Sequence, residues 1–485
     1  MLLSLQDGLL TPLSAMLKTT GLKAEEQASF EDIIKKQVES CNHLRAASVE
    51  KLVQFINSKE KKGLLVVNPA VVPEQIVGVG RNFAIKDVKV KCRGPDDKIY
   101  AQNPDIQRFV PRGLTLLCYP GDSNDSAAGD ILDPIIYANR KFTGGIGDED
   151  EEQPNSNEEW KQYFLAVPET ASLVVAIEKV NGEAAHFSGR FMDGKFCIFT
   201  GSKNVHMLIH NEDDIKYYEG DRYSTARTVA TTVMRTLAEM EESKRSLLQY
   251  FLHYTRFTIT CELAQPEYQH VVLLDHLERP VINVFAAYDI PEDFEAPHSL
   301  TAVPMHFFLS FVKALGLQTP TYTILPSAQD DCVRDFCRQV RKERCCEGRV
   351  LYYMKDAHCY TIGLCKIKTV WYIIIRAIRE KACFWLFKLV REPDQCSQED
   401  MLRSTHKRIN QIKDWLQLSQ ACVNQWKDLG ERFLRWCWHL QQSESSEFSV
   451  QKLRPEFPRW WKKFIDAQPV PEGRVSADDI PPFDD

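Results

Sequence analysis

The sequence lacks the short motifs that most often identify nucleotide and metal sites. Its 15 cysteines include no Cys-x-x-Cys pair, so the common cysteine zinc sites are not expected. Gly78-Val79-Gly80 has no third glycine at the spacing of a dinucleotide-binding fingerprint, and no glycine-rich loop continues into Gly-Lys-Ser/Thr. A Rossmann-type or P-loop nucleotide site is therefore not predicted.

A secretion signal and a membrane span are also not indicated. The opening segment, MLLSLQDGLLTPLSAML, contains Asp7 and no positively charged n-region. The apolar run at 369–390 has four charged residues in its middle, which are costly to bury in lipid: Arg376, Arg379, Glu380 and Lys381. We expect this run to form a buried strand followed by a helix. The odd number of cysteines fits reduced thiols, so a nuclear or cytoplasmic protein that is not secreted is predicted.

Charge is uneven along the chain, although the net charge is only −7. Acidic residues gather at 147–159, which we interpret as a solvated loop, and in the C-terminal segment ADDIPPFDD. Basic residues gather at 336–344 and 452–463. The total charge does not indicate a nucleic-acid-binding protein, so any surface of that kind has to be local.

The hydrophobic pattern predicts an α+β protein of about two or three domains. Helices are expected at 23–60, 223–252, 303–315 and 328–344, and everything after about residue 394 has helical spacing. Between these helices, turn residues separate short apolar runs that favour strands: LLVVN, LTLLCY, SLVVAIE, KFCIFT, RFTITCELA, VINVFAAYD and GRVLYYM.

Several charged residues lie in strand or turn settings downstream of one lysine. Lys179 follows the strand SLVVAIE, and the further members in chain order are Lys203, Glu262, Glu347-Gly348, Lys366 and Lys368. Each has an ordinary explanation by itself, such as a hairpin tip, a strand edge, a turn or a solvated strand face. The final lysine pair is harder to explain in this way, because residues two apart share one face of a strand. Two ammonium groups on a buried face require an anion between them.

Covalent nucleotidyl transfer uses these residue types together. A lysine that attacks the α-phosphate of a nucleotide must be neutral, and nearby cations lower its pKa. The same cations neutralise charge on the phosphate in the transition state. Carboxylates bind the ribose hydroxyls and a divalent metal.

In this order the residues resemble the motifs of the covalent nucleotidyltransferase superfamily. The similar segments are Lys179-Val180-Asn181-Gly182 (motif I), Glu262 in TCELA (motif III), Glu347-Gly348-Arg349-Val350 (motif IV) and Lys366-Ile367-Lys368 (motif V). KIKTVWY after an EGxV strand, and Ser202-Lys203 after the motif I hairpin, are typical of the phage and fungal tRNA-repair RNA ligases. VPRGLTLL and ANRKFTGG resemble elements upstream of the nucleophile in that family, so the similarity covers about 64–385.

The resemblance implies a fold and a division of the chain. An adenylyltransferase domain of antiparallel sheets with flanking helices would occupy 64–392. A helical extension at 1–63 would precede it. An all-helical C-terminal domain with an acidic tail would follow at 393–485.

The resemblance also implies ATP and Mg²⁺ as cofactors and a role for each matching residue. Lys179 would carry AMP, and Glu347 would help position the metal. Glu262 would bind the ribose or orient the surroundings of the nucleophile. Glu178 and the backbone near Val180 would contact the adenine, and Gly182 and Lys203 would complete the nucleotide pocket. The phosphate contacts would come from Arg112 and Lys141 at the β- and γ-phosphates and from Lys366 and Lys368 at the α-phosphate.

The implied activity is that of an ATP-dependent RNA ligase. It would join 5′-phosphate and 3′-hydroxyl ends through lysyl-AMP, in tRNA splicing or RNA repair. RNA such as tRNA halves would be the substrate, whereas DNA and membranes are not expected partners. The kinase and cyclic phosphodiesterase domains fused to the fungal enzyme have no counterpart here, so separate enzymes would prepare the ends.

Departures from the family pattern leave alternatives open. Asn181 stands where DNA ligases and capping enzymes usually have aspartate, and Ala184 stands where DNA ligases have arginine. A capping or DNA-ligase type of nucleotidyltransferase is one alternative, and a non-catalytic RNA-binding protein on a ligase fold is another. Four tryptophans near basic residues would either stack on RNA bases or pack the C-terminal helices together: Trp436, Trp438, Trp460 and Trp461.

Overall fold

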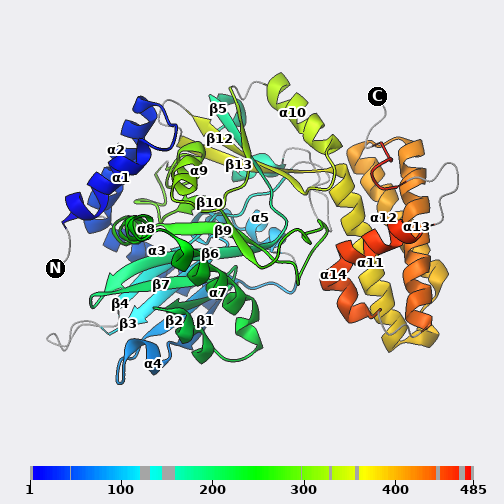
Figure 1. The fold of residues 1–485 in the computed structure, drawn as a ribbon, viewed down its shortest axis with the longest axis horizontal. Helices are drawn as coiled ribbons and strands as arrows, with labels where there is room; N and C mark the ends of the chain where they lie inside the picture. Colours follow the sequence, from blue (N-terminus) through cyan, green and yellow to red (C-terminus); the bar gives the residue numbers. More distant parts are fainter. Residues whose placement is uncertain are drawn as a thin grey trace.

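The computed structural model consists of three antiparallel sheets with flanking helices and a helical C-terminal region (Figure 1). This arrangement confirms the predicted α+β fold class. The structure describes residues 4–43, 45–94, 96–120, 131–144, 159–296, 298–326, 330–355, 360–443, 448–468 and 476–481. Most of the predicted acidic loop, 147–158, and the end of the acidic tail, 482–485, lie outside these residues.

Neighbouring strands are antiparallel within every sheet. The first sheet contains, in spatial order, β1 (Leu65–Val71), β2 (Ala84–Val90), β3 (Leu114–Tyr119) and β4 (Ile131–Tyr137). The second contains β10 (Val281–Tyr288), β9 (Thr258–Ala264), β6 (Glu183–Met192), β7 (Lys195–Ser202) and β8 (Val205–Ile209). The third contains β11 (Tyr322–Leu325), β5 (Leu173–Glu178), β12 (Gly348–Lys355) and β13 (Tyr360–Lys368).

Ten α-helices precede the C-terminal region in the described part of the chain. They are α1 (Thr11–Leu17), α2 (Ala24–His43), α3 (Arg45–Lys61), α4 (Glu74–Val77), α5 (Asp97–Gln102), α6 (Pro104–Phe109), α7 (Ser224–Glu239), α8 (Glu242–Thr255), α9 (Met305–Ala314) and α10 (Asp330–Lys342). The C-terminal region contains α11 (Val370–Arg391), α12 (Gln398–Leu416), α13 (Gln420–Gln442) and α14 (Val450–Ala467).

The N-terminal helices share a hydrophobic core with the five-stranded sheet. Leu13 of α1 and Phe30 of α2 are fully buried in the same cluster as Phe187 of β6 and Phe199 of β7. The rings of Phe30 and Phe311 of α9 lie edge to face with centroids 5.5 Å apart. Burial of these large side chains stabilises the contact between the N-terminal helices and the sheet.

The segment expected as one helix at 223–252 forms two helices, α7 and α8. Met240 and Glu241 have extended ψ angles of 147° and 138°, which interrupt the helical path. At its other end α8 stops at Arg256, whose φ of 59° lies in the left-handed region typical of helix termini.

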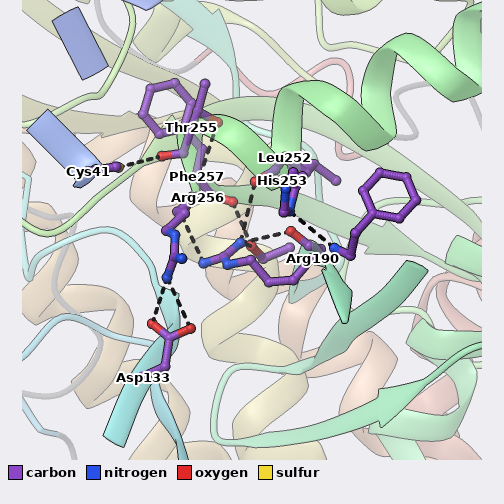
Figure 2. Close-up of polar contacts among 11 residues, drawn as sticks. Cys41, Asp133, Arg190, Leu252, His253, Thr255, Arg256 and Phe257 are labelled. Atoms are coloured by element: carbon purple, nitrogen blue, oxygen red, sulfur yellow. Dashed lines mark hydrogen bonds and ion pairs between the residues drawn. The ribbon is translucent and has the colours of Figure 1, made fainter. Parts of the chain in front are cut away.

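A buried arginine fixes the end of α8 against the sheets (Figure 2). Arg190 of β6 donates hydrogen bonds to the carbonyl oxygens of Leu252 and Arg256, both at 3.4 Å. Arg256 in turn lies 3.3 Å from the Asp133 carboxylate of β4. A cation at the C-terminal end of a helix also interacts favourably with the helix dipole. This cluster therefore has a structural role.

The apolar run at 369–390 is helical almost from its start, so the expected strand is wrong. β13 ends at Lys368, and the Thr369 hydroxyl accepts a hydrogen bond from the Tyr372 N–H at 3.0 Å. The β-branched residues that favoured a strand lie on buried faces of α11, where Ile374 and Ile378 are fully buried. Among the described residues, no helix is long and apolar enough to cross a membrane.

The helices α11 to α14 surround one hydrophobic core at the right of Figure 1. Trp438, Trp460 and Trp461 are 6%, 7% and 8% exposed and belong to this core. The ring centroids of Trp461 and Phe433 are only 4.9 Å apart. Packing of the helices, the second alternative for these tryptophans, is therefore confirmed, and a base-stacking surface has to be sought elsewhere.

Candidate active site

Lys179 lies in the short connection between two sheets. β5 of the third sheet ends at Glu178, and β6 of the five-stranded sheet begins at Glu183. The backbone N–H of Lys179 donates to the carbonyl oxygen of Gly348 at 2.9 Å, which extends the pairing of β5 with β12. The lysine side chain is 24% exposed. Lys179 is thus held where the third sheet and the five-stranded sheet meet.

Two glycines permit the close backbone approach at this seam. A Cβ atom at Gly182 would lie 2.2 Å from the carbonyl oxygen of Leu263 in β9. A Cβ atom at Gly348 would lie 2.0 Å from the carbonyl oxygen of Ile367 in β13, and its φ of 140° is one that other residues rarely adopt. The glycines of both predicted motifs therefore let the segments around Lys179 and Glu347 pack closely against β9 and β13.

Lys179, Asn181 and Glu347 form one polar network. Nζ of Lys179 lies 2.9 Å from Oε1 of Glu347, and Nδ2 of Asn181 donates to Oε2 at 2.8 Å. Oδ1 of Asn181 accepts the backbone N–H groups of Val271 and Val272, both at 3.1 Å. An aspartate here could not donate to Glu347 and would place a second carboxylate beside it. The departure from the usual aspartate therefore has a physical reason in this chain.

Two carboxylates determine the charge of Lys179. Burial lowers the pKa of its amine, but Glu347 and Glu262 act in the opposite direction, so the pKa is raised overall. The expected lowering by neighbouring cations is wrong, because these carboxylates act more strongly than the charge of Arg376, which does lower the pKa. Lys179 is accordingly an ammonium ion at neutral pH.

The two glutamates themselves differ. Burial raises the pKa of Glu262 to about 7, with the Glu347 charge adding to the effect and Lys179 opposing it. Burial also disfavours ionised Glu347, but Lys179 and Lys368 reverse the shift and lower its pKa. Glu347 is thus a stable anion, whereas Glu262 changes its protonation near neutral pH.

Three cations predicted to contact the nucleotide lie around a pair of aspartates that the sequence did not single out. Nζ of Lys203 and Nε of Arg112 are 2.9 and 3.2 Å from Oδ2 of Asp96, and Lys141 pairs with Asp97. Burial raises the Asp96 pKa, but Arg112 and Lys203 more than compensate and lower it to about 2. Acidic residues at the start of a helix such as α5 are common, so nothing in the sequence distinguished this pair.

The two lysines of β13 act on different charged clusters: one on Glu347 in the Lys179 network, the other on the cluster around Asp96 and Asp97. Lys366 and Lys368 share a strand face, as predicted from their spacing. Lys368 is only 4% exposed, and its charge contributes to the lowered pKa of Glu347. The charge of Lys366 instead lowers the pKa values of Lys141 and Asp97.

A cavity of about 240 Å³ opens beside Lys179, and we call it the small cavity. Seven of the predicted residues line it: Arg112, Glu178, Lys179, Val180, Lys203, Glu262 and Lys366. Phe142, Tyr352 and other apolar groups form much of the remaining wall. The Thr260 hydroxyl is buried on this wall and has no hydrogen-bond partner among the described residues. A buried hydroxyl of this kind fits a site that a polar ligand completes.

A second cavity of about 860 Å³ reaches Lys179 from the side of α11, and we call it the α11 groove. The predicted residues Gly182 and Glu347 line it together with Lys179. Lys141 and Lys368 are not among the residues that line either space. Lys179 therefore lies where the small cavity and the α11 groove meet.

Glu347 fits the role predicted for it in holding Mg²⁺, and Glu262 is the second carboxylate that acts on Lys179. Both carboxylates act on the charge of Lys179, and Glu347 is anionic. No group of three or more His, Cys, Asp or Glu side chains that could hold a metal occurs in the described parts of the chain. Mg²⁺ is usually bound through one or two carboxylates, water and substrate phosphates, so a complete protein cage is not required.

A family model described as a domain of unknown function, DUF7920, matches residues 158–379. The matched segment contains Lys179 and the predicted catalytic residues that follow it, whereas Arg112 and Lys141 precede it. No curated protein matches the chain.

Nucleic-acid ligases are among the solved structures to which the chain is similar. An archaeal ATP-dependent RNA ligase has 12% identity and a TM-score of 0.37, over 74% of this chain and 75% of that chain. A putative ATP-dependent DNA ligase from Aquifex aeolicus has 10% identity and a TM-score of 0.39, over 80% of each chain. A Naegleria gruberi RNA ligase mutant with ATP and Mn has 11% identity and a TM-score of 0.29, over 64% of this chain and 97% of that one. Since these TM-scores are below 0.5, a functional assignment depends on the site itself.

Proposed function

We propose that the protein is an ATP-dependent RNA ligase that joins 5′-phosphate and 3′-hydroxyl ends through AMP carried on Lys179. The position of Lys179 where the small cavity and the α11 groove meet is the observation that carries this proposal. A lysine that accepts AMP from ATP and passes it to a nucleic-acid end needs to face both substrates. The small cavity would take the nucleotide, because cations and an unpartnered hydroxyl line it.

The first step joins Lys179 to AMP. The ammonium group loses a proton, and the amine attacks the α-phosphate of ATP, forming a P–N bond as pyrophosphate leaves. Glu347 orients Nζ at 2.9 Å, and Glu262, with a pKa of about 7, is suited to accept the proton. Arg112 and Lys366 on the cavity wall would neutralise charge on the phosphates.

Magnesium would be held by Glu347, with Glu262 nearby, and by the ATP phosphates. Bound there, it would add positive charge against the reacting phosphate. The residues of this chain keep the other tasks, which are to orient the amine, accept its proton and bind the phosphates.

The second and third steps transfer and release AMP. The 5′-phosphate of an RNA end attacks the phosphorus on Lys179, which breaks the P–N bond and forms a 5′–5′ pyrophosphate link. A 3′-hydroxyl then attacks the RNA phosphate, forms the phosphodiester and releases AMP. Lys179 regains its proton and pairs again with Glu347.

The proposed setting is tRNA splicing or RNA repair in the nucleus or cytoplasm. The KIKTVWY segment and Ser202-Lys203 support a ligase of the phage and fungal tRNA-repair type. Separate kinase and phosphodiesterase enzymes would prepare the ends, with tRNA halves as the natural substrates.

A joining assay tests this function. The purified protein, ATP and Mg²⁺ are mixed with short RNA strands that carry a 5′-phosphate and a 3′-hydroxyl, in parallel with DNA strands of the same sequence. We expect joined or circular RNA, with adenylylated RNA as the intermediate, and neither product with Lys179→Ala. Joining of DNA alone would contradict the RNA assignment, and adenylylation by GTP instead of ATP would indicate a capping-type transferase.

A further inference from the structure

The α11 groove carries an excess of positive charge beyond Lys179. Five further cations line it, against two glutamates beyond Glu347: Arg376, Arg379, Lys388, Arg391 and Arg454, with Glu380 and Glu392. Glu380 forms an ion pair with Arg376, with Oε1 3.0 Å from Nε, and the other four cations outnumber Glu392. The groove as a whole therefore attracts anions, although the protein has a net charge of −7.

The lining residues that α11 contributes lie on a single face of the helix. Arg376, Arg379, Cys383, Phe387 and Arg391 recur every three or four residues, which places them on one side of the helix. Tyr268 and His270, between β9 and β10, and Arg454 of α14 line the groove as well. The groove is thus built between the sheets and the C-terminal helices.

Two buried side-chain nitrogen atoms in the groove lack hydrogen-bond partners among the described residues. Arg379 is 8% exposed, and its Nη2 donates to the Arg454 carbonyl oxygen at 2.9 Å, but its Nε has no hydrogen-bond partner among the described residues. Nε2 of His270 is also buried without a partner in the described chain. Leaving a buried guanidinium nitrogen unsatisfied is costly, so these atoms indicate a polar, anionic ligand.

Aromatic side chains accompany these cations. Phe384 is 61% exposed, which is unusual for a large apolar residue, and Phe387 and Tyr268 line the same space. Exposed aromatic rings beside arginine and lysine side chains are suited to unpaired nucleic acid, because bases stack on the rings while phosphates pair with the cations.

We propose that the α11 groove binds the 5′-phosphorylated end of a single-stranded nucleic acid and presents that phosphate to Lys179. This inference rests on the proposed function, because the end must reach the lysine that carries AMP. Arg376 and Arg379 lie on the α11 face that lines the groove, and Lys179 lines the same groove from the connection between β5 and β6. They would hold the terminal phosphates, while Lys388 and Arg391 would bind phosphates further along the strand.

Binding of labelled oligonucleotides to the whole protein tests the groove. The probes are short single strands of RNA and of DNA, each with a 5′-phosphate or a 5′-hydroxyl and a fluorophore at the 3′ end. The variants are Arg379→Gln, Arg376→Gln and the double change Lys388→Ala/Arg391→Ala. Arg391 is exposed and Lys388 is half-buried, so the double variant is expected to fold even if the Arg379 variant does not.

Lys381→Ala is the matched control, because Lys381 lies on the same helix but does not line the groove. We expect it to bind all probes as the wild type does. Each single groove variant should weaken binding of the 5′-phosphorylated probe by about tenfold, as expected when one charge-assisted hydrogen bond is removed, and the double variant by at least as much. Binding should also become less sensitive to salt, with a logarithmic slope shallower by roughly 0.7 for each phosphate of the single strand that the variant no longer neutralises.

The outcomes separate this inference from the proposed function. If the groove variants bind like Lys381→Ala while the wild type forms lysyl-AMP with ATP, the groove inference is overturned and the ligase proposal stands. If the groove variants lose binding but the wild type never forms lysyl-AMP, the ligase proposal fails and the groove remains a nucleic-acid site. Equal binding of RNA and DNA supports recognition through phosphates and bases, and tighter binding of RNA supports additional hydrogen bonds to 2′-hydroxyl groups.

Discussion

The two spaces that meet at Lys179 are built in different ways. The small cavity lies among sheets, and its charged residues come from several strands and turns. The α11 groove takes most of its charge from one helical face. The first is compact and has an apolar and aromatic wall, whereas the second is more than three times larger and strongly cationic.

This contrast fits a protein with two substrates of different shape. A nucleotide has a fixed size, so a rigid, strand-built cavity suits it. A nucleic-acid end needs a longer and more open surface that binds phosphates repeatedly. Variants on either side of Lys179 should therefore affect different measurements.

The largest effect is expected at the junction itself, from Glu347→Gln. Glutamine cannot pair with the Lys179 ammonium group or hold a metal as an anion, so we expect formation of lysyl-AMP to fall about thousandfold. The rate is measured with ATP labelled at the α-phosphate. Glu343→Gln is the control, because Glu343 pairs with Arg349 and lines neither space.

An unchanged or faster rate in Glu347→Gln would contradict this role. Loss of the carboxylate also lowers the Lys179 pKa, and if that were the only effect, more neutral amine would be present and the reaction would accelerate.

Glu262→Gln removes the ionisable group of the small cavity but keeps the size of the side chain, so it tests how the charge of Glu262 affects stability. The folded-state pKa of Glu262, about 7, lies above its usual value of 4.5. The folded protein therefore retains a proton that the unfolded chain releases between these values, and the free energy of unfolding falls as pH rises through this window. Glutamine removes this dependence, so the variant should gain up to about 3 kcal/mol relative to the wild type across it.

Denaturant unfolding at about pH 5 and about pH 8 measures this difference. Glu278→Gln is the control, because Glu278 is exposed and should give the same difference at both pH values. A Glu262→Gln difference that did not grow with pH would show that Glu262 is ionised throughout the range.

Asn181→Asp tests the departure from the usual motif. The change removes the Nδ2 donor 2.8 Å from Glu347 and places two carboxylates in contact. We expect lysyl-AMP formation to decrease about tenfold, since one charge-assisted hydrogen bond is removed. Asn424→Asp on α13 is the control outside both spaces. Full activity of Asn181→Asp would mean that the asparagine network does not matter for the reaction.

The smallest effect is expected from Asp96→Asn. Asp96 pairs with Arg112, which is proposed to contact ATP phosphates, and with Lys203, which lines the small cavity, so its carboxylate competes with the nucleotide. The variant should reach half-maximal adenylylation at a few-fold lower ATP concentration. Oligonucleotide binding should not change, because Asp96 does not line the α11 groove. A higher ATP requirement would instead show that Asp96 holds the two cations in position for ATP.

The sequence predicted the strand-borne part of the site better than the helical part. Lys179, Glu262 and Glu347 lie in strand or turn settings at the expected places, because glycines and short apolar strands constrain the backbone there. The roles assigned to them stay predictions. The α11 groove was not predicted, since charged residues every three or four positions are ordinary on a solvated helix.

Tertiary context accounts for the remaining differences. β-branched residues at the start of α11 favoured a strand, but burial against the C-terminal helices overrides that preference. The raised pKa of Lys179 could not be predicted, because it depends on the distance to Glu347, which is remote in sequence.

Covalent labelling of the protein tests the central claim most directly. The wild type and Lys179→Ala are first treated with pyrophosphate to remove any AMP already attached, and are then mixed with Mg²⁺ and ATP labelled at the α-phosphate. After denaturation, we predict acid-labile AMP on the wild type, none on Lys179→Ala, and none when labelled GTP replaces ATP. Absence of label from the wild type, or equal label on Lys179→Ala, would contradict the assignment of Lys179 as the nucleophile.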